Sequence, residues 1–555
     1  MEYLIYRNNP VNQFVQIELS FDCESNTTYS LQLPSWRPGR YEITNYAQKI
    51  RAFQVNHGTE TIHWQKETKD LWTFKSVQAG RYRISYEFHA AQMDAGGSWS
   101  DDEQLYINFI NCCFAVKDFE NAPVKVQLNL PEGFEVATAL PKKGKHLYQA
   151  TDYQHLVDSP LMASASLKHY SYQVKRSNFH LWFQGEIHFD VPQLIRQFEA
   201  FTEKQVDAFG EFPAEDYHFL YQLLPYKHYH GVEHQFSTVI TFGPADSLKE
   251  KSEMDEFFGV SCHELYHFWN VCRIRPKPLL PYDFSKEVYF DTGIVAEGVT
   301  TYMGDLFLLK SGYFSLSTFL DNMQKQLARE FGSFGWQNQA ISASSWDLWL
   351  DGYKAGIPER KVSIYNRGAL ISTILDLMLL DQGSSLHQVM KIMWERFGKP
   401  QKGYTMQDFT QVIAACYGND QVIQQFFEKY VQENHDIFPL LCEQMESVNI
   451  SIKTIPHTQV LAANWGIQAL SDGTISKVHP DSPAYKLLMQ GDKIITINHQ
   501  SFSPALPLEN EPLQLEIDRF GRKLTPALEA STTNYYLEYL LIAGESNPKR
   551  KRWVK

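Results

Sequence analysis

The sequence predicts a multidomain α+β protein. Its 555 residues exceed what one hydrophobic core usually holds, so several domains are expected. The first part alternates apolar and polar residues with the period of a β-strand, whereas apolar residues in the middle recur at helical spacing. We therefore expect a β-sandwich-like domain over residues 1–170 and a mainly helical domain over residues 171–446.

Three segments carry the strand pattern of the first domain, because in each of them alternate residues are apolar. These residues are Val15, Ile17, Leu19 and Phe21, then Tyr82, Ile84, Tyr86 and Phe88, then Val124, Val126, Leu128 and Leu130. In the middle domain the clearest helical patterns cover Val362–Leu380 and Leu386–Phe397.

The segment Ser261–Val271, SCHELYHFWNV, places two histidines one helical turn apart. On a helix His263 and His267 project from the same face, so both can bind one zinc ion while Glu264 lies beside the open coordination position. Ser261 and Glu264 also fit a capping box, and paired histidines can be ordinary core residues. However, the apolar run before Ser261 indicates that the helix has already begun. The pattern indicates a zinc peptidase.

A hydrolytic zinc site takes three protein ligands and leaves one position to water. The stretch Asp291–Gly312 predicts a second helix, with Asp291 or Thr292 as its cap and Gly312 at its end. Glu297 lies in its first turns among apolar neighbours, where an unpaired carboxylate would be unfavourable. Glu297 is therefore the candidate third ligand, and a solvated helix glutamate is the alternative.

The stretches HELYHFWNVCRIRP, from His263, and AEGVTTYMGDL, from Ala296, resemble the active-site motifs of the glycyl aminopeptidase family of zinc metallopeptidases. This family has a thermolysin-like catalytic domain of the gluzincin type and a PDZ domain. The resemblance implies that His263, His267 and Glu297 hold one Zn²⁺ per chain and that Glu264 is the general base. It also implies removal of small amino-terminal residues, especially glycine and alanine, from peptides.

Two further segments resemble motifs of the same family. Residues 231–237, GVEHQFS, resemble a strand that borders the substrate cleft, which makes Gly231 and Glu233 the substrate-binding candidates, with Glu233 meeting the free amino group. His230 stands where a glycine is usual. Residues 364–376 resemble a helix start at which Tyr365 helps to stabilise the oxyanion, with Arg367 in place of the commoner lysine. The alternatives are a surface glutamate on an edge strand and a core tyrosine.

The segment Leu33–Ile50, LPSWRPGRYEITNYAQKI, resembles the opening β-domain motif of the family. It contains a turn rich in proline and glycine. We interpret it as a structural turn of the β domain. The alternative is a wall of the substrate cleft.

The carboxyl-terminal part resembles a PDZ domain. Gly473–Asn498 has a strand, a short helix opened by Ser482-Pro483, and an isoleucine-rich strand, which predicts a PDZ-like domain over residues 447–545. Residues 462–466 match a carboxylate-binding loop poorly, and prolines after residue 503 leave little room for a long second helix. A peptide- or protein-binding module and a purely structural one are both open. Residues 447–459 predict a linker, and residues 546–555 a solvated basic tail.

Composition excludes several classes of function. The formal net charge of −13 disfavours nucleic acid as a partner. No apolar run reaches the ~18 residues that span a bilayer, and no signal peptide is recognised, so we expect a cytoplasmic protein without a membrane partner. The seven cysteines are odd in number and scattered, which argues against a disulfide framework, and Cys262 and Cys272 beside the metal helix are predicted to be buried thiols. The sequence leaves the oligomeric state open.

The expected mechanism uses zinc to activate water, Glu264 to move its proton, Tyr365 to support the oxyanion and Glu233 to anchor the amino terminus. Asp305 is one candidate acceptor for a ring nitrogen of a metal-binding histidine, although a surface aspartate is the simpler interpretation. A zinc endopeptidase is the nearest rival function. A second rival is a binding scaffold with a structural zinc site, which would need a fourth protein ligand such as Cys262 or Cys272.

Overall fold

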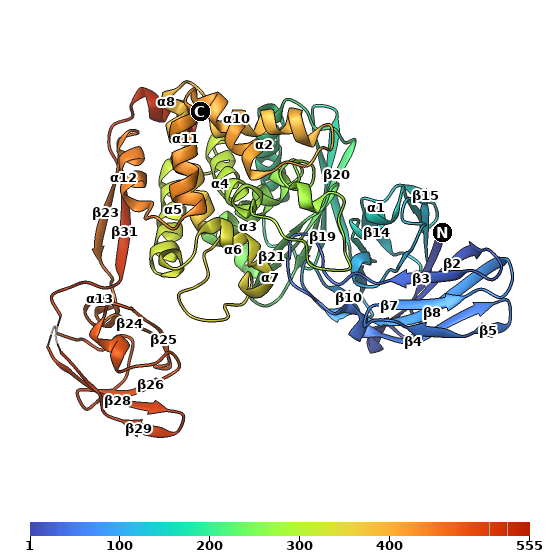
Figure 1. Cartoon of the computed structure of the whole chain (residues 1–555), viewed down its shortest axis with the longest axis horizontal. Helices are drawn as coiled ribbons and strands as arrows, with labels where there is room; N and C mark the ends of the chain where they lie inside the picture. Colours follow the sequence, from blue (N-terminus) through green and yellow to red (C-terminus); the bar gives the residue numbers. More distant parts are fainter. Residues whose placement is uncertain (510, 530) are drawn as a thin grey trace. The chain divides into compact units, whose positions relative to one another are not determined.

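The computed structural model describes residues 1–509, 511–529 and 531–555, which divide into two compact units (Figure 1). One unit comprises Met1–Leu316, Gly335–Asp436 and Val554–Lys555, and the other comprises Ser317–Phe334 and Ile437–Trp553. Within the described residues, no helix is long and apolar enough to cross a membrane.

The first unit begins with a β-rich domain, as predicted. Its largest sheet runs in the order β15(Lys142–Gly144), β16(Leu147–Ala150), β13(Val124–Leu128), β1(Glu2–Tyr6), β2(Phe14–Cys23), β8(Gly80–His89), β4(Ile50–His57), β5(Glu60–Ile62). A second sheet runs β12(Ala115–Val116), β3(Thr28–Gln32), β7(Leu71–Lys75), β6(Trp64–Lys66). Apolar side chains of both sheets share one core, so the strand-period residues predicted in β2 and β8 are buried.

A third sheet lies at the end of the β-rich domain. It runs β14(Glu135–Thr138), β17(Leu161–Ser164), β11(Gln104–Ile107), β10(Ser98–Ser100), β9(Ala91–Gln92), and the short helix α1(Tyr153–Val157) precedes β17. The predicted strand pattern extended to Leu130, but β13 ends at Leu128, three residues before Pro131. Proline restricts the residue before it, which is consistent with an early strand end.

The middle block is largely helical, as predicted, but it begins with a sheet that the prediction did not include. Its strand order is β18(Lys168–Val174), β19(Ser177–Gln184), β20(Asp216–Leu223), β22(Ser237–Gly243), β21(His228–Glu233), with helix α2(Val191–Phe209) between β19 and β20. Strands β19, β20 and β22 are parallel, and β21 is an antiparallel edge strand. All seven residues of β22 are buried, so this strand lacks the alternating pattern that reveals a strand in sequence.

Helices follow this sheet. They are α3(Lys251–Tyr266), a π-helical segment Ile294–Val299 that leads into α4(Thr300–Lys310), α6(Ile341–Trp346), α7(Leu348–Asp351), α8(Asn366–Asp381), α9(Leu386–Met393), α10(Met406–Tyr417) and α11(Asp420–Phe427). The predicted helices at 362–380 and 386–397 correspond to α8 and to α9 with its π-helical extension Trp394–Gly398. Helix α8 begins later than predicted, where the Ser363 hydroxyl accepts a hydrogen bond from the Asn366 N–H.

The second unit contains most of α5(Leu316–Phe331), together with α12(Phe438–Glu446) and α13(Val460–Trp465). Strand β23(Ile450–Pro456) pairs with β31(Leu537–Ala543), and β24(Ile467–Ala469) pairs with β25(Ile475–Val478). A further sheet contains β27(Gln500–Ser501), β26(Lys493–Ile497), β28(Leu513–Arg519) and β29(Arg522–Leu524), and β30(Ala527–Leu528) pairs with β28. The expected linker at 447–459 is therefore largely a strand.

The basic terminus is not a solvated tail. Pro548–Val554 forms helix α14, in which Lys549, Arg550 and Trp553 are buried. Lys549 Nζ donates to the Ser447 hydroxyl at 2.7 Å, and Arg550 Nη2 donates to the Gly544 carbonyl at 2.6 Å. Long basic side chains can bury their stems while their charged ends bind carbonyls, which composition alone does not reveal.

Candidate metal centre and active site

His263 and His267 lie at the end of α3 and face one another. His263 is in the last turn of the helix, and His267 is the residue that ends it. Their Nε2 atoms are 3.0 Å apart, and the ring of His267 is almost fully buried. The helix runs for more than two turns before Ser261, so the metal motif lies near the helix end and not at a capping box.

Glu297 completes the cluster from the π-helical segment. Its Oε2 atom lies 3.4 Å from Nε2 of His267 and 3.7 Å from Nε2 of His263, and its side chain is 4% exposed. A tetrahedral zinc ion with bonds of about 2.0–2.1 Å has ligand atoms separated by about 3.3 Å. Two imidazoles and one carboxylate with these separations fit such an ion and leave one position open.

Asn270 connects the two elements that carry the ligands. The ring nitrogen Nδ1 of His267 lies 2.8 Å from the Asn270 carbonyl oxygen, which fixes Nδ1 as the protonated nitrogen and leaves the Nε2 lone pair for a metal. The Asn270 amide donates to the carbonyl of Val295 at 2.7 Å and to the Thr300 hydroxyl at 3.0 Å. For His267, the orienting acceptor is therefore Asn270 and not the candidate Asp305.

The backbone turns sharply just after Asn270. Val271 has φ of 91°, a conformation that β-branched residues rarely adopt, and its side chain is buried against Cys272 and Ala296. Such strain persists only where surrounding contacts hold it, and it concentrates near functional sites.

Three buried carboxylates surround His267. Burial lowers the pKa of the His267 ring, but the carboxylates of Glu297, Glu233 and Glu264 outweigh this effect and raise it to about 10. Burial opposes ionisation of Glu297, yet His267 and His263 lower its pKa to about 2. The cluster therefore binds a positive charge strongly, as a proton or as a metal ion.

Glu264 lies beside this cluster without joining it. Its side chain is buried, and within the described parts of the chain no donor reaches its Oε2 atom. Burial raises the pKa of Glu264 well above its ordinary value. A Cβ on Gly231 would come within 2.2 Å of Glu264 Oε1, so the edge strand β21 lies directly against this carboxylate. A buried carboxylate with a raised pKa has the properties of a general base near neutral pH.

Glu233 ends strand β21 and points to the same cluster, so it is not a surface glutamate. Atoms of Glu233, Glu264 and His267 that can bind a metal lie within 4.8 Å of one another. Burial raises the pKa of Glu233, and no donor among the described residues reaches its Oε1 atom. A Cβ on Gly39 would come within 2.4 Å of Glu233 Oε2.

The turn that carries Gly39 is part of the site. The Trp36 ring N–H donates to the Asp283 carbonyl at 2.8 Å, and the Tyr41 N–H donates to the Tyr353 hydroxyl at 2.9 Å. Because Gly39 lies against Glu233, the segment from Leu33 to Ile50 forms a wall of the site as well as a turn of the β domain. The interpretation as a structural turn alone was too narrow.

Arg37 and His230 lie next to this wall. Arg37 Nη2 is 3.4 Å from Nε2 of His230, and Asp94 Oδ1 is 3.8 Å from Nδ1 of His230. Burial, together with Arg37, lowers the pKa of His230 to about 4, so this ring is neutral at physiological pH. His230 therefore links the edge strand to the β-rich domain.

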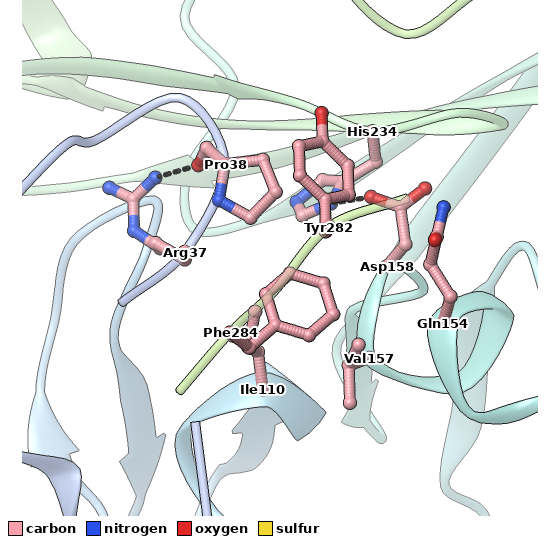
Figure 2. Close-up of a pocket in the computed structure, with 9 residues that line it drawn as sticks. All are labelled: Arg37, Pro38, Ile110, Gln154, Val157, Asp158, His234, Tyr282 and Phe284. Carbon is pink, nitrogen blue, oxygen red and sulfur yellow. Dashed lines mark hydrogen bonds and ion pairs between the residues drawn. The ribbon is translucent and has the colours of Figure 1, made fainter. Parts of the chain in front are cut away.

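His234 directly follows strand β21, and its ring atom Nδ1 lies 3.1 Å from Asp158 Oδ1 (Figure 2). Arg37, Tyr282 and Phe284 line an adjacent cavity of about 10 Å³, which has room for about one water molecule.

Tyr365 immediately precedes α8 and lies near the ligands. Burial, and then the charge of Glu297, raise the pKa of Tyr365 well above its ordinary value, so its hydroxyl stays a neutral donor. The close packing of Gly298 against Gly368 brings the two segments together, because a Cβ on Gly298 would lie 2.5 Å from the Gly368 Cα. Arg367 is buried and donates to the His435 carbonyl at 2.6 Å, which gives it a structural contact of its own.

Sequence reasoning did not single out Asn270 or Tyr353, and it placed Gly39 and Tyr41 only in a segment that it interpreted as a structural turn. Asn270 follows His267 by three residues, and a search for acceptors just beyond the metal helix would have found it. Gly39 and Tyr353 come from segments far away in the sequence, and no spacing argument connects them to Glu233.

The cysteines take no part in the metal cluster. In residues 1–509, 511–529 and 531–555, the groups of side chains that can hold a metal contain only histidines and glutamates. All seven cysteines are free thiols, and Cys262 and Cys272 are buried, as predicted. A structural zinc site with a fourth cysteine ligand is therefore not supported.

Comparison with protein families gives two matches. Residues 2–165 match the peptidase M61 N-terminal domain, and residues 256–371 match the M61 glycyl aminopeptidase domain. The chain belongs to the M61 peptidase family. This M61 chain is therefore a peptidase, and its matched catalytic segment contains His263, Glu264, His267, Glu297 and Tyr365.

A solved structure shows the same fold. An aminopeptidase N family protein from Idiomarina loihiensis shares 24% of its sequence with this M61 peptidase, with full coverage of both chains and a TM-score of 0.92. An M1 zinc metallopeptidase from Deinococcus radiodurans is 14% identical over 78% of this chain and 93% of its own, with a TM-score of 0.49. No curated protein matches this chain.

Proposed function

We propose that this M61 peptidase is a zinc-dependent aminopeptidase that removes small amino-terminal residues, glycine and alanine, from peptides. The observation that carries the proposal is the convergence of His263, His267 and Glu297, whose ligand atoms are 3.0–3.7 Å apart. A bound zinc ion would lower the pKa of a water molecule and polarise the scissile carbonyl. We assign one zinc ion per chain and a thermolysin-like fold to residues 171–446.

Glu264 is the proposed general base. It takes the proton of the attacking water and delivers it to the leaving amine, and its raised pKa suits both steps. Tyr365 donates a hydrogen bond to the carbonyl oxygen under attack, because a neutral hydroxyl can stabilise developing negative charge.

Glu233 is the proposed anchor for the substrate's ammonium group. With neutral imidazoles and all three carboxylates ionised, Glu233, Glu264 and Glu297 together carry a formal charge of −3, and one divalent cation leaves −1. A free amino terminus supplies the remaining positive charge, whereas an internal peptide bond does not. This balance favours an aminopeptidase over an endopeptidase, because an uncompensated buried charge is unfavourable.

The preference for small residues rests on the family match and on crowding around Glu233. Gly39 and Gly231 bring backbone against the carboxylates of Glu233 and Glu264. This crowding leaves little space beside the ammonium site for a large first side chain.

The deciding experiment compares one peptide with a free and with an acetylated amino terminus. We expect the zinc-loaded enzyme to release glycine or alanine from the free peptide and to reject the acetylated one. A chelator should abolish the activity, and added zinc should restore it. Equal cleavage of both peptides would identify an endopeptidase, and activity that survives complete metal removal would contradict the zinc mechanism.

We also propose that residues 447–545 form a PDZ-like module. Strands β24 and β25, the short helix at Pro483–Lys486 and strand β26 follow one another in the order expected. Helix α13 lies where a peptide-binding loop would be, so we favour a structural role. Titration of the full chain with peptides that end in a free carboxylate tests this role. Saturable binding of such a peptide to the second unit would contradict it.

A further inference from the structure

A second group of candidate metal ligands lies beside the first. Atoms of Glu233, Glu264 and His267 lie within 4.8 Å of one another, and all three side chains are at least nine-tenths buried. Among the described residues, no hydrogen-bond donor reaches Glu264 Oε2 or Glu233 Oε1. A buried carboxylate oxygen without a donor is satisfied either by a proton or by a bound cation, and a cation at sufficient concentration displaces the proton.

We propose that Glu233 and Glu264 bind a second divalent cation, zinc at excess concentration, which occupies the place of the substrate's ammonium group. This inference rests on the proposed function, because it takes the first cation to be held by His263, His267 and Glu297. With Nε2 of His267 engaged there, the second cation is held by the two carboxylates and solvent.

The negative charge of the buried carboxylates favours binding of a second cation. When all three carboxylates are ionised, the first cation leaves a formal charge of −1 among them, and either an ammonium ion or a second divalent cation with a bound hydroxide cancels this charge. The second cation therefore binds more weakly than the first, because it has no imidazole ligand and competes with the amino group of the substrate.

Backbone contacts hold the carboxylates of Glu233 and Glu264 in place. Gly39 lies against Glu233 and Gly231 lies against Glu264, so backbone restricts both side chains. A pre-positioned pair of carboxylates loses little conformational freedom when it binds an ion. A cation at this position would block both the general base and the amine anchor, and would inhibit the enzyme by raising KM for peptides with free amino termini.

Metal analysis after equilibrium dialysis against increasing free zinc tests the proposal without measuring activity. We expect one tightly bound zinc ion and a second, weaker one. Glu233→Gln should weaken the second by at least tenfold and keep the first. The surface imidazoles of His169 and His180, with ring nitrogens 3.0 Å apart, are the rival location, so His180→Ala serves as the matched control and should keep both ions.

Competition by an amine gives a second readout on the unaltered protein. Glycinamide carries the ammonium group and should displace the second zinc at fixed free zinc, whereas N-acetylglycinamide should not. Absence of a second ion, or its loss in His180→Ala but not in Glu233→Gln, would overturn the proposal. Failure of the first ion to bind would instead overturn the proposed zinc site itself.

Discussion

The carboxylate of Glu264 lies directly against the backbone of Gly231. A Cβ at position 231 would come within 2.2 Å of Oε1 and 2.7 Å of the carboxylate carbon of Glu264. Residue 231 lies in the regular edge strand β21, so close approach and not an unusual backbone conformation requires glycine there. The position of the base therefore depends on a residue with no side chain.

Gly231→Ala should displace Glu264 and lower kcat/KM by roughly 10- to 100-fold, because small displacements of a catalytic group have effects of this size. We expect zinc content to stay at one ion per chain, since no zinc ligand is touched. Steady-state kinetics with metal analysis measures both. Gly259→Ala on α3 is the control, because no atom lies within 4 Å of its added Cβ. It should keep activity and stabilise the helix by about 0.5–1 kcal/mol.

Glu264→Gln tests the role of the base directly. The amide keeps the shape of the side chain but cannot accept the water's proton, so we expect kcat to fall by about 10²–10⁴-fold or more while zinc stays bound. Glu256→Gln on the exposed face of the same helix is the matched control and should retain wild-type kcat. Wild-type turnover in Glu264→Gln would rule out the proton shuttle.

Removal of the hydroxyl should change different kinetic constants at Tyr365 and at Tyr353. Removing an oxyanion donor lowers kcat by about 10²–10³-fold, so Tyr365→Phe should act on kcat. The Tyr353 hydroxyl accepts from the Tyr41 N–H and holds the turn that carries Gly39, so Tyr353→Phe should act mainly on KM for peptides with free amino termini. Steady-state kinetics of both variants on one substrate separates these effects. A large loss of kcat in Tyr353→Phe but not in Tyr365→Phe would mean that Tyr353, and not Tyr365, is the oxyanion donor.

The metal motif could be predicted from sequence because its geometry is local. His263 and His267 are one turn apart on one helix, and Glu297 lies in a segment whose apolar neighbours indicated burial. Glu233 needed the family resemblance, because an edge-strand glutamate in isolation is most simply a surface residue. In the structure Glu233 is buried, and Gly39, nearly two hundred residues away, lies against its carboxylate.

Other parts of the fold were hidden from sequence for physical reasons. Strand β22 is buried on both faces and therefore lacks alternation. The predicted linker at 447–459 is a strand because β31 pairs with it from a distant part of the chain. The terminal helix buries Trp553, which a count of basic residues in the same segment could not indicate.

The metal-free protein should lose stability as the pH rises. The pKa of His267 is about 10 in the fold and 6.5 ordinarily, so its contribution is fully present below pH 6.5 and is lost as pH rises through 10. Zinc binding needs the neutral ring, so stabilisation by zinc should grow over the same interval. Thermal unfolding with and without chelator at pH 6, 8 and 10 measures this. A His267→Gln variant with the same pH dependence would contradict the assignment.

Helix α14 should stabilise the second unit. The ring of Trp553 is 1% exposed, and its centroid lies 5.6 Å from that of Phe319 in an edge-to-face contact. Trp553→Ala should lower the free energy of unfolding by about 3–5 kcal/mol. Denaturant unfolding measures this, with Lys551→Ala, on the exposed face of the same helix, as the control. A change below about 1 kcal/mol in Trp553→Ala would mean that α14 is not packed in solution.

Asn270 should set the affinity for the metal although it is not a ligand. Its amide donates to the Val295 carbonyl and to the Thr300 hydroxyl, and its own carbonyl orients the ring of His267. Loss of the amide in Asn270→Ala frees the segment that carries Glu297 from the end of α3. Because groups that orient ligands typically contribute 10- to 100-fold in affinity, we expect zinc to bind that much more weakly.

Stability must be separated from metal affinity in this variant. A buried carbonyl that loses its donor destabilises a protein by about 1–3 kcal/mol wherever it lies. Asn111→Ala is the matched control, because Asn111 is equally buried and its amide donates to the Gly96 carbonyl and the Ser98 hydroxyl, away from the zinc ligands. Both variants should unfold more easily. Only Asn270→Ala should release zinc to a competing chelator at lower concentration, and equal zinc retention in the two variants would show that Asn270 has a structural role alone.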